Sequence, residues 1–219
     1  MKNILQILAA AALILMMTGC ATTPVAYDYS AYKASKPRSI LVLPPVSHAP
    51  DIDASPSMLS VATLPLAEAG YYVLPVAPVY ETFRQNGVMV AEDAQSIEVR
   101  KLREIFGADA ALYITVEKYG SVYQVLSSAV IVSADAKLVD LRTGEMLWQG
   151  HAQASSAENQ NNGGGLLGML VSAAVNQIVN QVTDRGHQIA GVASVRLLSA
   201  GHPSGLLYGP YNPKYEAEK

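Results

Sequence analysis

The side chains that could carry out chemistry lie far apart in this sequence. Its four histidines form no i,i+4 pair and have no cysteine beside them, so their spacing indicates no metal site. They are His48, His151, His187 and His202. Asp51 and Asp53 are similar to the start of a calcium loop, but the glycine and the terminal glutamate of such a loop are missing. No serine lies in a Gly-x-Ser-x-Gly elbow. We therefore expect no catalytic residues, no metal and no cofactor.

Two further features have a chemical and a structural interpretation. The run 163–165, three glycines before an apolar segment, could bind an anion at a helix N-terminus. No P-loop lysine follows it, so a flexible hinge is the favoured interpretation. Trp148 is the one tryptophan, and we expect it to anchor the core rather than to bind a ligand.

Cys20 is the residue for which the sequence predicts a modification. Lys2 precedes an almost unbroken apolar run over 4–17, which is too short to span a bilayer and is typical of a signal peptide. The sequence Leu15-Met-Met-Thr-Gly-Cys20 resembles a bacterial lipobox, which implies acylation of the thiol and cleavage before it. We expect residues 1–19 to be the leader and Cys20, the only cysteine, to carry the lipid anchor.

The remaining chain is long enough for one domain with a substantial core. Without the leader it has 14 basic and 18 acidic side chains and no basic run, so nucleic acid is not an expected partner. The net negative charge indicates that membrane attachment depends on the acyl chains. The absence of Asp or Glu just after Cys20 is typical of an outer-membrane destination in enteric-type sorting. We expect the domain in the periplasm, with exposure on the cell surface left open.

The pattern after Cys20 predicts an α/β fold. Residues 20–38 are polar and favour a lipidated tether, either a plain linker or a segment whose tyrosines lie on the domain. A strand over 39–45, a helix over 55–69 and a strand over 71–75 form a βαβ unit. Gly70 lies where a helix C-terminal glycine is expected.

The second half predicts an antiparallel three-stranded meander and a long C-terminal helix. Alternating residues mark the strands, and 142–145 is a glycine-containing hairpin loop. The fold class is therefore a three-layer-like mixed β-sheet flanked by helices, in a single domain over 39–199 with an extended tail over 200–219. The expected elements are helices at 78–86, 93–106 and 166–184, and strands at 110–119, 122–141 and 146–152, with a turn at Gly120-Ser121. Residues 191–199 could form a helix or a strand, and a helix is favoured.

Tyrosines near both ends of the mature chain and one apolar helix are the expected interaction surface. Gly168 and Ser172, four residues apart beside Leu166, would permit close helix packing and a homo-oligomer. The helix over 166–184 is interrupted by amides, which favours packing on the sheet over contact with lipid. The tyrosines are Tyr27, Tyr29, Tyr32, Tyr208, Tyr211 and Tyr215.

Three stretches together carry a resemblance to a known family. They are Ile40-Leu-Val-Leu-Pro-Pro45, Gly107-Ala-Asp-Ala-Ala-Leu-Tyr-Ile-Thr-Val116 and Leu138-Val-Asp-Leu-Arg-Thr-Gly-Glu-Met-Leu-Trp148. They resemble the periplasmic fold of CsgG, the curli-secretion lipoprotein, and of the amino-terminal domain of TolB. Within that superfamily, residues 39–182 are most similar to bacterial lipoproteins of the GNA antigen group. This resemblance implies an outer-membrane lipoprotein with CsgG-like envelope lipoproteins as partners, and it brings no catalytic residues.

Two functions follow as hypotheses. The first is a non-enzymatic, lipid-anchored assembly or accessory component of an envelope or secretion complex. The alternative is a small-molecule-binding component of a transport system. A secretion pore is disfavoured, because the amphipathic hairpin pairs with which CsgG-type proteins build a barrel are not evident in the sequence.

Overall fold

The computed structural model describes residues 27–124, 127–158 and 184–215. Cys20, Leu166, Gly168 and Ser172 lie outside the described residues. The signal peptide, the acylation and the helix expected over 166–184 therefore stay predictions.

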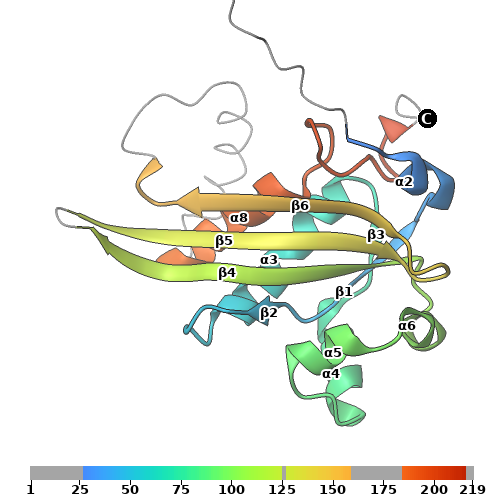
Figure 1. Cartoon of the computed structure of the whole chain (residues 1–219), viewed down its shortest axis with the longest axis horizontal. Coiled ribbons are helices and arrows are strands. Elements are labelled where there is room, and N and C mark those ends of the chain that lie inside the picture. The colour runs from blue at the N-terminus through green and yellow to red at the C-terminus, as the bar shows by residue number, and fades with distance from the viewer. Residues whose placement is uncertain (1–26, 125–126, 159–183, 216–219) are drawn as a thin grey trace, which may run out of the picture.

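Helices and strands alternate along the first half of the described chain, and long strands dominate the second half (Figure 1). In chain order they are α2 (Ser30–Ser35), β1 (Ser39–Val42), β2 (Val46–Ser47), α3 (Ala54–Glu68), β3 (Tyr72–Val73), α4 (Val76–Gln85), α5 (Ala91–Ser96), α6 (Val99–Phe106), β4 (Ala110–Gln124), β5 (Ser127–Asp140), β6 (Met146–Ser155) and α8 (Arg185–Leu198).

The strands form one mixed sheet in the order β3-β1-β4-β5-β6, with β2 beside β4. β1 runs parallel to both β3 and β4, whereas β4, β5 and β6 pair antiparallel. The βαβ unit and the meander are therefore confirmed, and with them the α/β fold class. The short strand β2 was not predicted. Ile40, Leu41 and Val42 of β1 are almost fully buried, as expected for a strand covered on both faces.

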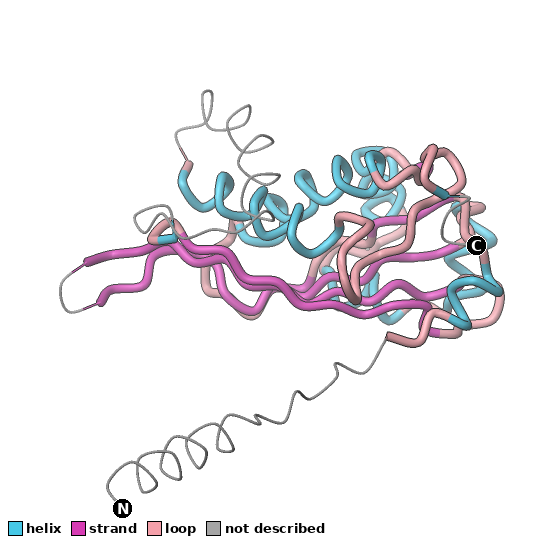
Figure 2. The backbone as a smooth tube through the Cα atoms, turned by 90° about the horizontal axis from the view of Figure 1, so that it is seen from above, coloured by secondary structure: helices cyan, strands magenta, loops and turns pink. Residues whose placement is uncertain are grey.

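Helices cover the sheet on both sides, but unequally. α3 and α8 lie on one face, where they bury Leu112, Ile114 and Trp148 (Figure 2). α4, α5 and α6 pack on the opposite face over the parallel strands, around Leu43 and Leu102. The second layer of helices covers only one end of the sheet, so the long strands continue beyond it (Figure 1).

The turn predicted at Gly120-Ser121 is wrong. β4 continues to Gln124, and Gly120 lies within it, paired with Ile131. Glycine accepts the φ of +112° at this position without ending the ladder, since it has no Cβ to clash. A register shift between Val116 and Lys118 marks a bulge nearby. The result is a hairpin longer than the sequence indicated.

The single helix predicted over 93–106 is two helices, α5 and α6. Ile97 and Glu98 between them have extended backbone, with ψ of 136° and 134°. The side chain of Gln95 donates to the carbonyls of Pro44 and Ile114, which fixes α5 against the sheet. Because these two extended residues separate the helices, the buried positions of α6 do not continue the helical pattern of α5. Ile105, expected inside, is therefore 48% exposed.

The predictions for α3 and for the last helix are confirmed. Met58, Ala62 and Leu66 of α3 are buried as the pattern indicated, and Gly70 follows with a φ of +95°. α8 begins earlier than expected, at Arg185, because the carboxylate of Asp184 accepts hydrogen bonds from backbone N–H groups of the first turn.

Candidate functional site

The tyrosines from the two ends of the mature chain come together at one end of the molecule. Residues 27–38 with α2, and residues 200–215 after α8, lie at the end opposite the tip of the β4–β5 hairpin (Figure 1). We call this region the tyrosine end. It comprises Tyr27, Tyr29, Tyr32, Tyr71, Tyr208, Tyr211 and Tyr215.

Hydrogen bonds from tyrosine hydroxyls fix residues 27–38 to the domain. The hydroxyls of Tyr32, which is 3% exposed, and Tyr71 are 2.8 Å apart. Tyr29 donates to the carbonyl of Gly205 over 2.5 Å, and Tyr27 accepts from the backbone N–H of Gln149. Each ring buries apolar area while its hydroxyl keeps a polar partner. The described residues thus match the interpretation in which the tyrosines lie on the domain, rather than the plain linker.

The tail lies on the same surface. The backbone N–H groups of Gly209 and Tyr211 donate to the carbonyls of Ala69 and Gly70, over 2.8 and 3.1 Å. A Cβ on Gly70 would lie 2.4 Å from the backbone nitrogen of Asn212, so only glycine permits this approach. Trp148, 1% exposed, donates from Nε1 to the carbonyl of Ser204. Its predicted role as a core anchor is confirmed.

The tyrosine end contains a cavity and carries positive charge. The cavity is about 250 Å³ and is lined in part by Lys33, Lys36 and Tyr215. The guanidinium carbon of Arg38 lies 5.9 Å from the ring centroid of Tyr211, and Nζ of Lys214 lies 5.4 Å from that of Tyr208. These are cation–π distances. Lys33, Lys36 and Arg38 are close together in the sequence, and the fold brings Lys214 from the other end of the chain to the same region.

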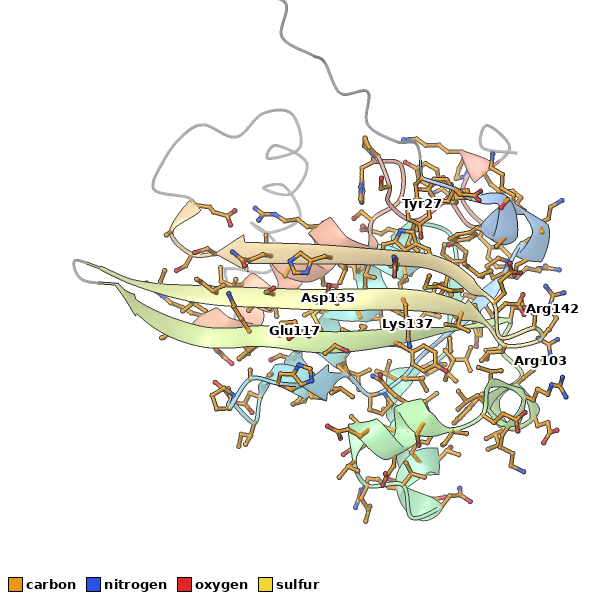
Figure 3. The ribbon with its side chains drawn as sticks, in the orientation of Figure 1. Tyr27, Arg103, Glu117, Asp135, Lys137 and Arg142 are labelled. Atoms are coloured by element: carbon orange, nitrogen blue, oxygen red, sulfur yellow. The ribbon has the colours of Figure 1, made fainter. Side chains whose placement is uncertain are left out.

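A second candidate surface is the part of the sheet that α4–α6 leave uncovered, which we call the open sheet face. Side chains alternate across a strand, so the residues between the buried positions of β4, β5 and β6 all point to this face. Figure 3 shows several of them on neighbouring strands. They are Thr115, Glu117, Asp135, Lys137, Gln149 and His151.

Charged and polar groups on the open sheet face are paired across strands. His151 Nδ1 lies 2.9 Å from Asp135 Oδ1, and His48 Nδ1 lies 3.0 Å from Glu117 Oε2. The ammonium of Lys137 lies 4.9 Å from the ring centroid of Tyr113, whose pKa is raised by burial. A groove of about 720 Å³ runs beside β6. A broad polar face of this kind suits contact with another macromolecule better than enclosure of a small substrate.

Asp140 links the tyrosine end to the hairpin between β5 and β6. Burial alone would raise the pKa of Asp140, but its hydrogen bonds outweigh burial and lower the pKa to about 2. The donors are the side chains of Arg142 and Ser35 and the backbone N–H groups of Arg142 and Thr143. Ser35 Oγ donates over 2.5 Å from the end of α2. The Val-Asp-x-Arg-Thr-Gly motif therefore has a structural role, because it holds α2 in place.

A serine–histidine pair that sequence reasoning missed lies between the two helices on the covered face. Ser57 Oγ lies 3.2 Å from Nδ1 of His187 and 2.9 Å from the hydroxyl of Tyr119. Ser57 is 8% exposed, and burial, the largest cause, raises the pKa of Tyr119. The three residues come from α3, β4 and α8. The arrangement joins these elements, and its burial disfavours access by a substrate.

The described residues show neither a metal-binding cluster nor a membrane-spanning helix. They contain no group of three or more His, Cys, Asp or Glu side chains able to hold a metal ion. Across the same residues, every helix is too short or too polar to cross a membrane.

The chain is similar to known lipoproteins along most of its length. A protein-family model described as "Putative lipoprotein GNA1162-like" matches residues 27–211. The chain is 50% identical over 184 residues to a Neisseria meningitidis serogroup B protein named "Putative lipoprotein NMB1124/NMB1162". The match covers 84% of this chain and 85% of that protein.

Solved structures include a relative of the same kind. The crystal structure of lipoprotein GNA1162 from Neisseria meningitidis is 53% identical, with a TM-score of 0.55, and the match covers 66% of this chain and all of that one. The PelC dodecamer from Paraburkholderia phytofirmans is 13% identical with a TM-score of 0.41, over 80% of this chain and 91% of that one. The second likeness is too weak to support any inference about function.

Proposed function

This chain belongs to the GNA1162-like lipoprotein family, and from that premise we propose that it is a non-enzymatic assembly or accessory component of an envelope or secretion complex. Cys20 carries the acyl chains, the outer membrane holds them, and the domain works in the periplasm through contacts with other proteins.

The open sheet face is the observation that carries this proposal. An antiparallel sheet can leave one face to solvent, and here the exposed Asp135, Lys137 and His151 form a polar surface over β5 and β6 that is available to another protein. Paired charges in fixed geometry give register and selectivity to a protein contact. We assign the partner-binding role to this face.

The proposal also names a class of partner. The hairpin motif from Leu138 to Trp148 resembles CsgG-like lipoproteins, so we propose proteins of that kind as partners. A homo-oligomer through Leu166, Gly168 and Ser172 is a second mode of assembly. It is compatible with a hetero-complex, because these residues are separate in sequence from those of the open sheet face.

Site-specific photo-crosslinking in cells tests the partner-binding role. A photoreactive residue replacing Lys137 or Gln149 should give a discrete adduct with another envelope protein. The matched control replaces Tyr80, which lies on α4 and is 45% exposed. An adduct pattern that is the same at all three positions, or none at Lys137 and Gln149, would contradict the proposal.

Mass spectrometry of the exported protein tests the anchor separately. The mature chain should begin at Cys20 and carry the mass of its acyl chains. A mature chain with Cys20→Ala, exported behind an ordinary secretory leader, should be released from the membrane fraction by washing at high salt, since no other acylatable thiol is present in the sequence and salt screens surface attraction. A bare thiol or a retained leader in the native protein would remove the basis for its location.

The alternative, binding of a small molecule, is favoured by one observation, the cavity of about 250 Å³ at the tyrosine end. Aromatic walls with lysines at the rim suit a planar anionic compound. A metabolite that raises the melting temperature of the native chain, but not of a Tyr208→Ala variant, would establish this function. An unresponsive metabolite panel would exclude it in favour of protein contacts.

A further inference from the structure

We propose that the tyrosine end docks onto the headgroup layer of the anionic membrane in which the protein is anchored. The proposal adds a membrane-binding surface to the proposed function, and it rests on that function only for the anchor at Cys20.

The length of the connection to the anchor is the first support. Only residues 21–26 separate Cys20 from Tyr27, which the structure fixes to β6 through the backbone N–H of Gln149. A fully extended chain of that length spans at most about 25 Å. An acylated protein must therefore keep the surface around Tyr27 close to the bilayer.

The shape of the molecule gives the second support. Residues 27–38 and the tail lie toward one end of the long axis, and the tip of the β4–β5 hairpin lies at the other end (Figures 1 and 2). A short connection that leaves from the first end brings that end to the lipid. The hairpin and much of the open sheet face then remain available to partners in the periplasm.

Charge complementarity is the third support. The described segments 27–38 and 200–215 carry four cationic side chains and one carboxylate, Asp28. The cations are Lys33, Lys36, Arg38 and Lys214, and all four are exposed. The mature chain as a whole is acidic, so this local excess is opposite in sign to the rest. The sequence adds Glu216, Glu218 and Lys219 after the tail, which reduces the excess without reversing it.

The aromatic residues complete the match to a membrane interface. Tyrosine places an apolar ring and a polar hydroxyl at the level of the headgroups, and lysine extends its ammonium toward phosphate. Tyr211 is 61% exposed beside Arg38. An aromatic surface with cations around it is suited to anionic lipid.

Vesicle binding by the full mature chain with Cys20→Ser tests the docking without the acyl chains. The chain should bind vesicles of phosphatidylethanolamine and phosphatidylglycerol, and not vesicles of phosphatidylcholine alone. Each lysine near an anionic surface changes partitioning about fivefold, so Lys33→Gln/Lys36→Asn/Lys214→Gln should weaken binding at least tenfold. Asn is used at position 36 because Lys36 has a φ of +49°.

The matched control is Arg84→Gln/Lys101→Gln/Lys118→Gln, which changes net charge equally at exposed positions elsewhere. It should bind like the parent chain. Equal weakening of both variants, or no binding of the parent chain to anionic vesicles, would overturn the proposal. Should the first variant fail to fold, Glu216→Gln/Glu218→Gln provides the test: it should bind more tightly than the parent, and unchanged binding would count against docking.

A fluorescent label shows which end contacts lipid. On the same Cys20→Ser chain, a polarity-sensitive dye at Ala34→Cys on α2 should shift to shorter wavelength on anionic vesicles. The same dye at Ser121→Cys, exposed on β4, should not shift. A shift at Ser121 alone would mean that the opposite end binds, which refutes the orientation. These results do not depend on acylation, so a bare Cys20 in the native protein would contradict the proposed function without altering them.

Discussion

At the scale of single residues, Asp140 shows how a buried carboxylate can connect segments that lie far apart in the sequence. It accepts hydrogen bonds from Ser35 of α2 and from Arg142 of its own hairpin, and its side chain is 2% exposed. These partners stabilise the charged form, which is why the pKa falls although burial opposes ionisation.

Replacing Asp140 with Asn should make the stability difference from the native chain depend on pH. The folded pKa of about 2 lies below the unfolded value of about 4, so this stabilisation is complete above the unfolded pKa and is lost as pH falls through the folded pKa. Near neutral pH we expect Asp140→Asn to cost about 1 kcal/mol, after allowance for screening by solvent. Urea unfolding of both chains at a series of pH values measures this difference in the free energy of unfolding.

The control for this prediction is Asp135→Asn, whose carboxylate is exposed on the open sheet face. Its effect on unfolding should be small, as for exposed ion pairs in general. The interpretation of Asp140 fails if its Asn variant unfolds at the same urea concentration as the native chain throughout the pH range.

At the scale of elements, α2 and its flanking residues depend on side chains rather than on their own helical propensity. Six residues are too few for a helix that is stable in isolation. The side chain of Tyr29, the N-cap residue, makes no capping hydrogen bond, and only Asp28 accepts from the first backbone N–H of α2, that of Ser30. The buried ring of Tyr32, the hydroxyl of Tyr29 and the contact of Ser35 with Asp140 hold the segment in place.

Tyr32→Ala should therefore free residues 27–38 without unfolding the sheet. Loss of a buried aromatic ring costs several kcal/mol locally, and trypsin should then cut after Lys33 much faster than in the native chain. Lys36 is not a second site, because Pro37 follows it and trypsin does not cleave a Lys–Pro bond. Tyr80→Ala, which changes an exposed tyrosine on α4, should leave cleavage unchanged. Mass spectrometry of the early fragments identifies the cut sites. Protection equal to the native chain would show that Tyr32 is not needed to hold α2.

Sequence patterns could predict elements defined by local periodicity, and failed where distant contacts decide. The apolar run of β1 and the face of α3 are local, so both were found. The turn at 120–121 was wrong because cross-strand pairing with Ile131 and Val130 outweighed a local glycine signal. The break at Ile97 and Glu98 depends on Gln95 reaching the carbonyl of Ile114, which no window along the chain contains.

The candidate surfaces, like the secondary structure, could be predicted only where local sequence decides them. The tyrosines were singled out by residue type, but their union with Tyr71 requires hydrogen bonds between residues far apart, such as Tyr29 and Gly205. The positive character of this end could not be read from composition, because Lys33 and Lys214 come from opposite ends of an acidic chain. The open sheet face follows from strand alternation only once α4–α6 are known to stop short of it.

At the scale of the whole molecule, anchor and docking surface act together. An acyl anchor with a short connection raises the local concentration of the tyrosine end at the lipid, so even weak docking should be nearly complete. Docking in turn fixes which side of the domain faces away from the membrane. A partner would then meet the open sheet face in one orientation rather than in many.

Lengthening the connection to Cys20 separates the contribution of the acyl anchor from that of docking to the orientation of the domain. A flexible insert of about 20 Gly and Ser residues before Tyr27 adds an r.m.s. reach of about 25 Å, which lets the acylated domain leave the surface. Energy transfer from a dye at Ala34→Cys to a membrane acceptor should remain high at low salt, because docking persists. It should fall at high salt, where surface charge is screened. The chain without the insert should respond weakly to salt, since its connection alone keeps α2 near the bilayer. A lengthened chain that loses transfer even at low salt would show that the connection, and not docking, sets the orientation.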